Sequence, residues 1–200
     1  MFKQSLRRFN RRWLPAAVLA VVVITGALVL RFELRAEGDS PRLITTQDLP
    51  EDVQHEVSTV WERYEALTEG RRDSCPEDVS LVLVAEVVGG DARYVFSDRR
   101  MEIEIPTSPR RFRDSLAHEL AHHLDATCAD AHQLRQAWSE AGGLAEDDWR
   151  SGPWETRPAE LFAETMVEII NGERVRFGRT MPLPDFALEL VRAWLSEELL

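Results

Sequence analysis

The chain has 200 residues, of which 44% are hydrophobic and 30% charged, and it contains two cysteines. This composition is typical of one folded domain, and it excludes a disordered tail, a collagen-like chain and a disulfide-rich miniprotein. The net charge of −11 argues against a nucleic-acid-binding surface. The charge is divided unevenly, because residues 1–36 sum to +6 and residues 37–200 to −17.

The basic N-terminal part contains a candidate membrane segment. Residues 13–30 carry no charged side chain in an eighteen-residue run, and five basic residues precede it. A helix of this length covers roughly 27 Å, and the positive-inside rule leaves its N-terminus in the cytoplasm. We therefore expect a basic cytoplasmic tail (1–12), a transmembrane signal anchor (13–30), a linker (31–47) and an extracytoplasmic domain (48–200).

A cleaved signal peptide is the alternative interpretation, because an export signal has the same order of charges. The long apolar run, and the lack of a small-x-small cleavage site after it, favour the uncleaved anchor. One lysine beside 23 arginines is typical of a GC-rich bacterial genome. The expected location is thus a bacterial cell membrane.

Export would place both cysteines in an oxidising compartment. A disulfide between Cys75 and Cys128 would close a loop of about fifty residues and contribute roughly 4 kcal/mol by the chain-entropy model. Buried free thiols are the alternative. Neither cysteine has the spacing to another that a zinc site requires.

Hydrophobic periodicity and turn residues divide the body into helices and strands. The first helix is expected from Asp48 to near Gly70, followed by three strands at 79–88, 92–96 and 100–106. Capping residues then predict a helical half, with helices at 108–127, 130–141, 157–171 and 185–200. The expected fold is α+β, with a small antiparallel sheet packed on a mainly helical domain and one transmembrane helix before it.

The predicted helix that begins at Ser108 carries the sequence HELAH at 118–122. Residues four apart lie on one helical face, so the imidazoles of His118 and His122 can reach the same ion. Glu119 is rotated away from that axis, which suits a general base for a zinc-bound water. A surface helix with two solvated histidines is the alternative. The apolar leucines and alanines around these residues argue for a metal, because buried polar groups need partners.

A catalytic zinc site needs a third protein ligand. Glu160 and Glu164 lie four apart in the mostly apolar segment 158–164, so one could bind the ion while the other supports a histidine from behind. Asp125, three residues after His122, is a second candidate for such outer support. The alternative for the glutamate pair is a charged helix edge.

The two motifs together, HELAHHLD (118–125) and RPAELFAE (157–164), resemble the gluzincin-type zinc peptidases, in particular the compact lethal-factor-like and Mlc-titration-factor-like members. The resemblance covers roughly residues 79–170 and implies a zincin-like fold with one Zn²⁺ per chain. It implies that His118, His122 and Glu160 bind the zinc, that Glu119 is the base, and that Glu164 supports a ligand.

The resemblance also implies a strand that aligns peptide substrate before the zinc helix. The matching segment consists of Met101, Glu102, Ile103, Glu104 and Ile105. Several relatives carry a tyrosine shortly before the ligand glutamate that can stabilise the oxyanion. Residues 144–157 contain no tyrosine, so the sequence assigns no residue to that role.

These observations predict a membrane-anchored zinc metalloprotease that hydrolyses peptide bonds by Glu119-assisted attack of a zinc-bound water. The expected partners are a peptide or protein substrate and the membrane, with no nucleic acid. Two other classes stay open. One is a zinc-binding but catalytically silent tethered interaction domain, and the other is a zinc hydrolase of non-peptide amides such as cell-wall cross-links.

Overall fold

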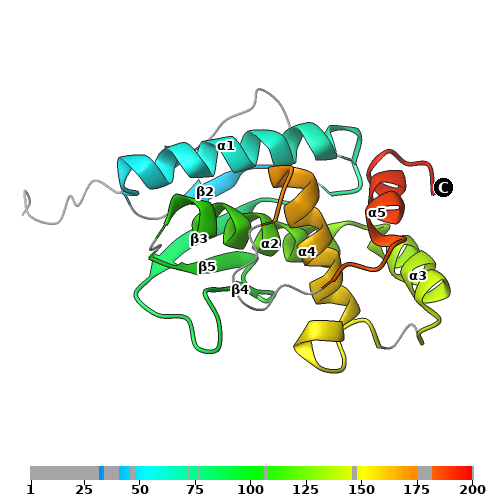
Figure 1. Cartoon of the computed structure of the whole chain (residues 1–200). Coiled ribbons are helices and arrows are strands. Elements are labelled where there is room, and N and C mark those ends of the chain that lie inside the picture. Colours follow the sequence, from blue (N-terminus) through cyan, green and yellow to red (C-terminus); the bar gives the residue numbers. More distant parts are fainter. Residues whose placement is uncertain are drawn as a thin grey trace, which may run out of the picture. The chain divides into compact units, whose positions relative to one another are not determined.

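A mixed β-sheet and five α-helices make up the part of the chain that the computed structural model describes (Figure 1). The described residues all belong to one unit, Arg31–Leu200, and are 32–33, 41–45, 48–71, 73–75, 77–105, 108–145, 148–174 and 182–199. The tail and the transmembrane helix expected at 1–12 and 13–30 lie outside them. Within the described residues, no helix is both long enough and apolar enough to cross a bilayer.

The five-stranded sheet has the order β1 (Phe32–Glu33), β2 (Leu43–Thr45), β3 (Val79–Val84), β5 (Arg100–Glu104), β4 (Ala92–Val95). The strand β3 pairs in parallel with both β2 and β5, whereas β1–β2 and β4–β5 are antiparallel. The α+β class is confirmed, but the prediction of an antiparallel sheet is wrong.

The parallel pairing has its origin in the segment expected to be a linker. Strand β2 lies within 31–47, and the helix α1 (Glu51–Thr68) connects it to β3 as a crossover. A crossover helix returns the chain to the same end of the sheet, so the two strands it joins run in the same direction. Three residues are too few to show strand alternation in the sequence, which is why β2 was missed.

The position of β5 corrects a second expectation. Its residues pair with β3 on one side, for example Leu81 with Met101, and with β4 on the other, for example Tyr94 with Met101. An interior strand has no free backbone groups to offer a substrate. The segment Met101–Ile105 therefore cannot align a peptide along its edge, and within the described sheet the free edge on this side belongs to β4.

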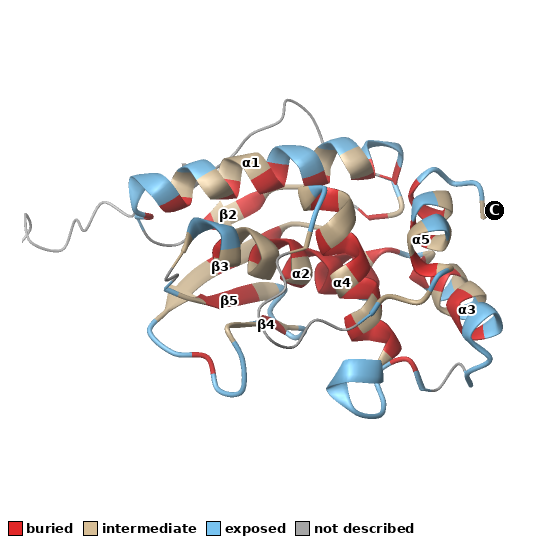
Figure 2. Ribbon diagram, viewed as in Figure 1, coloured by how far each residue is buried: buried red, intermediate tan, exposed pale blue. Residues whose placement is uncertain are grey.

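The helical half is built around α2 (Pro109–Thr127) and α4 (Pro158–Asn171), which pack against each other (Figure 1). The helix α2 also packs on β4 and β5, and α1 covers α2 and α4. Buried residues follow the facing sides of α2 and α4 in Figure 2. The interior thus continues from the sheet through α2 to α4, and it holds the candidate site between two long helices.

Local signals in the sequence fix the ends of these helices. Ser108 caps α2, its side chain accepting from the Arg111 backbone N–H at 3.3 Å, and a proline follows it at the first helical position. The helix α4 begins with Pro158 and ends at Gly172, whose φ of 74° is left-handed. The last helix, α5 (Ala187–Leu195), is shorter than expected and ends before Glu197, which has a φ of 62°.

The remaining helix, α3 (Ala131–Gly142), packs against α5. The sulfur atoms of Cys75, before β3, and Cys128, at the end of α2, lie at the distance of a disulfide bond. The backbone N–H of Ala129 donates to the carbonyl of Ser74 at 2.8 Å beside them. These links attach the C-terminal end of α2 to the segment that enters β3.

Candidate metal centre

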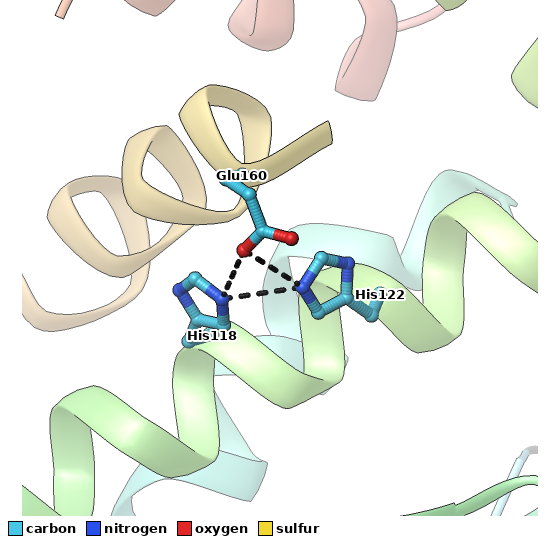
Figure 3. A group of neighbouring side chains, drawn as sticks. All are labelled: His118, His122 and Glu160. Carbon is cyan, nitrogen blue, oxygen red and sulfur yellow. Dashed lines mark hydrogen bonds and ion pairs between the residues drawn. The ribbon is translucent and has the colours of Figure 1, made fainter. Parts of the chain in front are cut away.

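The helices α2 and α4 bring together three side chains that could hold a metal ion. His118 and His122 come from consecutive turns of α2, and Glu160 from the first turn of α4. Their side chains are 14%, 11% and 11% exposed, and their nearest ligand atoms all lie within 4.8 Å of one another. Figure 3 shows the two imidazoles and the carboxylate pointing toward one common point.

The separations between the ligand atoms are short and even. The Nε2 atoms of His118 and His122 lie 3.2 Å apart. Oε2 of Glu160 lies 3.2 Å from Nε2 of His118 and 3.5 Å from Nε2 of His122. One carboxylate oxygen and two ring nitrogens therefore surround a single position.

Glu164 determines what His118 presents to that position. Its Oε1 lies 3.3 Å from Nδ1 of His118, on the far side of the ring. An ionised carboxylate can only accept, so Nδ1 carries the hydrogen and Nε2 of the neutral ring carries a lone pair. That lone pair faces a carboxylate oxygen and another ring nitrogen, so a proton or a metal cation is needed between them.

The electrostatics of the cluster favour positive charge. Burial acts to lower the pKa of His118, but the hydrogen bonds to Glu160 and Glu164 outweigh it and raise that pKa to about 10. Burial acts to raise the pKa of Glu160, whereas the two histidines outweigh it and hold that pKa well below its usual range. The same groups that attract a proton would attract a divalent cation.

Arg157 holds the other oxygen of Glu160. Its Nη1 lies 3.3 Å from Oε1 of Glu160, and its Nη2 donates to the carbonyl of Gly152 at 3.1 Å. The two oxygens of Glu160 thus have different partners, because Oε2 faces the histidines and Oε1 the guanidinium. Arg157 positions the carboxylate so that one oxygen is directed to the shared point.

Glu119 lies beside this cluster with a buried carboxylate. Its residue is 3% exposed, and its Oε2 has no hydrogen-bond partner among the described residues. Burial raises its pKa, although His118 and His122 counteract that effect. Glu119 also lines the cavity in front of the cluster. A carboxylate with raised pKa at a cavity wall is suited to accept a proton from a molecule bound there.

The cavity has a volume of about 990 Å³ and opens onto the three candidate ligands. The edge strand β4, the loop before it and residues from the segment 154–160 contribute to its lining. Val88, Phe96 and Trp154, which also line the cavity, are among the exposed large apolar residues. The cleft therefore offers a strand edge, apolar surface and several arginines to a bound molecule.

Asp125 does not support the histidines, contrary to the expectation from the sequence. Its fully buried carboxylate accepts from Nε of Arg135 at 2.9 Å and from Nη2 of Arg150 at 2.5 Å. One further turn of α2 has carried Asp125 away from the ion position and toward α3 and the loop before α4. Of the two proposed outer carboxylates, only Glu164 contacts a candidate ligand within the described part of the chain.

His123, next to a candidate ligand, has ordinary hydrogen-bond partners instead. Its Nε2 donates to the carbonyl of Glu77 at 3.0 Å, so its Nδ1 accepts from the Tyr94 hydroxyl, also at 3.0 Å. Burial lowers the pKa of His123 to about 4 and raises the pKa of Tyr94 to about 12. The Tyr94 hydroxyl is therefore committed to a structural contact and does not replace the tyrosine absent from 144–157.

Sequence reasoning did not find the roles of Arg157 and Arg150, nor the contribution of β4 to the cleft. Arg157 stands directly before Pro158, and its place at the start of α4 was the one signal that could have located it beside Glu160. No protein-family model, curated protein or solved structure matches the chain.

Proposed function

We propose that the protein is a zinc metalloprotease whose ligands are His118, His122 and Glu160. The observation that carries the proposal is the convergence of two Nε2 atoms and one carboxylate oxygen beside the buried, unpartnered carboxylate of Glu119. The resemblance of the two motifs to gluzincin-type peptidases supports the same ligand set. A zincin-like architecture, with the zinc helix packed on the sheet, is part of the proposal.

The donor set fits zinc by type and by spacing. Zinc prefers histidine nitrogen and carboxylate oxygen at about 2.0–2.2 Å in a tetrahedral arrangement, which places neighbouring ligand atoms about 3.4 Å apart. The separations among His118, His122 and Glu160 are 3.2, 3.2 and 3.5 Å. Three protein ligands leave a fourth position for water or substrate, as catalytic zinc sites require.

In the proposed reaction, a bound zinc ion would polarise the scissile carbonyl and lower the pKa of a neighbouring water molecule. Glu119 accepts the proton of the attacking water and then donates it to the leaving amine. Its buried position and raised pKa suit both steps, because a carboxyl with a raised pKa holds a proton more readily and can then return it to the leaving group. Glu164 orients His118 through Nδ1, and Arg157 orients Glu160 through Oε1.

The peptide would bind along β4, which takes the place expected for the segment Met101–Ile105. The strand β4 lies at the edge of the sheet and lines the cavity beside the candidate ligands. An extended peptide can add to a sheet edge through main-chain hydrogen bonds. In this proposal Phe96 and Trp154 contact apolar side chains of the substrate.

Hydrolysis of an unstructured protein substrate by the purified full-length chain tests the proposal. Activity should disappear with EDTA, return with Zn²⁺ and be absent from Glu119→Gln. One bound zinc per chain without cleavage of protein would instead support the catalytically silent interaction domain. Cleavage of cell-wall cross-links but not of protein would support the non-peptide amide hydrolase.

We further propose that residues 13–30 anchor the domain outside the cytoplasmic membrane. The uncharged run behind a basic tail supports this topology, and a disulfide between Cys75 and Cys128 suits an oxidising compartment. A reporter fused after Leu200 should be active only outside the cytoplasm, and the chain should stay with membranes after alkaline washing. Release of a soluble body would identify a cleaved signal instead.

A further inference from the structure

We propose that Arg150 forms a carboxylate-binding subsite in the cleft. The preferred substrates would then be peptides that carry an acidic side chain or a free C-terminal carboxylate near the bond that is cleaved. The inference rests on the proposed protease function for the reaction itself. The preference for a carboxylate, however, is a property of binding, and it can be measured without hydrolysis.

Two contacts hold the Arg150 guanidinium in place. Its Nη2 donates to Asp125, whose side chain is completely buried. Its Cζ lies 4.3 Å from the centroid of the Phe96 ring, so the charged group stacks on an aromatic face. An arginine fixed in this way loses little conformational freedom when it binds a ligand.

Arg150 retains more unused donors than Arg93, Arg111 and Arg157, which also line the cavity. Arg93 and Arg111 each direct two guanidinium nitrogens to a single carboxylate, and Arg157 uses two on Glu160 and Gly152. For Arg150, the hydrogen bonds found within the described residues involve Nη2 alone. Its side chain is 48% exposed and lines the cavity. Nε and Nη1 are therefore open to a ligand in the cleft.

Arg150 lies close to the proposed reaction centre. The Phe96 ring beneath it lies 6.4 Å, centroid to centroid, from the ring of His122. A group bound to Arg150 would thus be separated from the candidate ligand His122 by one aromatic ring. The planar guanidinium matches a carboxylate better than any neutral group, because it can donate two parallel hydrogen bonds.

The binding of short fluorescent peptides to the full-length Glu119→Gln protein with Zn²⁺ tests the inference. The peptides are built from Ala, Ser and Phe and form three arms: one internal Glu with an amidated C-terminus, Gln in its place, and a neutral peptide with a free C-terminus. At least one of the two peptides that carry a carboxylate, the Glu peptide or the peptide with the free C-terminus, should bind about tenfold more tightly than the amidated Gln peptide. The arm that shows this preference identifies the source of the carboxylate.

Arg150→Met should abolish the preference, and Arg150→Lys should reduce it, because lysine lacks the planar pair of donors. Arg135→Met is the matched control, since Arg135 binds the same Asp125 carboxylate but does not line the cavity. It should keep the preference. Equal binding of all three peptides, or a preference that survives Arg150→Met, would overturn the subsite.

These results are separable from those on the proposed function. A carboxylate preference without hydrolysis by the Glu119-containing protein would keep the subsite and reject the protease. Hydrolysis without any carboxylate preference would keep the protease and reject the subsite.

Discussion

His122 and His123 are neighbours in α2, but they face two different environments. The Nε2 of His122 meets another ring nitrogen and a carboxylate oxygen, and a cation or a proton is needed to reconcile them. Both nitrogens of His123 have complementary partners, the Tyr94 hydroxyl and the Glu77 carbonyl. We call these the metal face and the structural face of α2.

The difference shows how a ligand can be distinguished from a buried structural histidine. Buried polar groups in folded proteins are nearly always hydrogen-bonded, so a satisfied histidine needs no further explanation. A group of converging acceptors is costly by itself and indicates a site for a cation. Asp125 belongs with the structural face by this criterion, because two arginines already satisfy it.

The largest expected effect concerns the base on the metal face. Glu119→Gln should lower the rate of peptide hydrolysis by about a thousandfold, because an amide cannot accept the proton of water. Zinc content, measured by atomic absorption, should stay at one per chain, since Glu119 is not a ligand. Retained activity in this variant would contradict the proposed mechanism even if zinc were bound.

Replacement of the two glutamates of α4 should weaken zinc binding to different extents. Glu160→Ala removes a ligand and should weaken binding by more than about a hundredfold, so that the protein purifies nearly free of zinc. Glu164→Ala removes only the carboxylate behind His118 and should weaken binding by about 10–100-fold. Competition with a chromogenic chelator measures both. The reverse order would mean that the ligand is Glu164, one helical turn after Glu160.

Asp125→Asn tests whether Asp125 belongs to the structural face of α2. It leaves Arg135 and Arg150 without their shared buried charge, and it should lower the free energy of unfolding by about 2 kcal/mol. Zinc affinity should not change, because Asp125 contacts neither histidine ligand in the described structure. A tenfold loss of zinc affinity at unchanged stability would show that Asp125 does support a metal ligand.

Tyr94→Phe should have the smallest effect of these substitutions. It removes the hydroxyl that donates to His123, and it should lower the free energy of unfolding by about 1 kcal/mol. Urea unfolding with EDTA present measures this without a contribution from bound metal. If Tyr94→Phe instead left stability unchanged and reduced hydrolysis, Tyr94 would have a role in the reaction.

Local sequence signals were sufficient to predict the helices of the site. Ser108 and Pro109 set the start of α2, Pro158 and Gly172 the ends of α4, and helical spacing placed His118 and His122 on one face. The selection of Glu160 over Glu164 came from the resemblance to a family. Spacing within α4 alone could not tell which carboxylate faces α2.

The sheet was harder to predict because its pairing is not local. A three-residue strand such as β2 has too short a pattern to recognise, and without it the parallel pairing with β3 cannot be foreseen. The order β3–β5–β4 is equally invisible in the sequence, so Met101–Ile105 was taken for an edge. The contact between Asp125 and Arg150 was missed for the same reason, since it joins residues 25 positions apart.

The zinc content of the adjacent variants His122→Ala and His123→Ala tests the central claim most directly. Each full-length protein is purified, incubated with excess Zn²⁺, freed of unbound metal and compared with the unsubstituted chain. The assigned faces predict that His122→Ala loses the metal, while His123→Ala keeps one zinc per chain although it is less stable. Equal zinc retention by both variants, or loss from His123→Ala alone in a protein that is still folded, would contradict the metal centre.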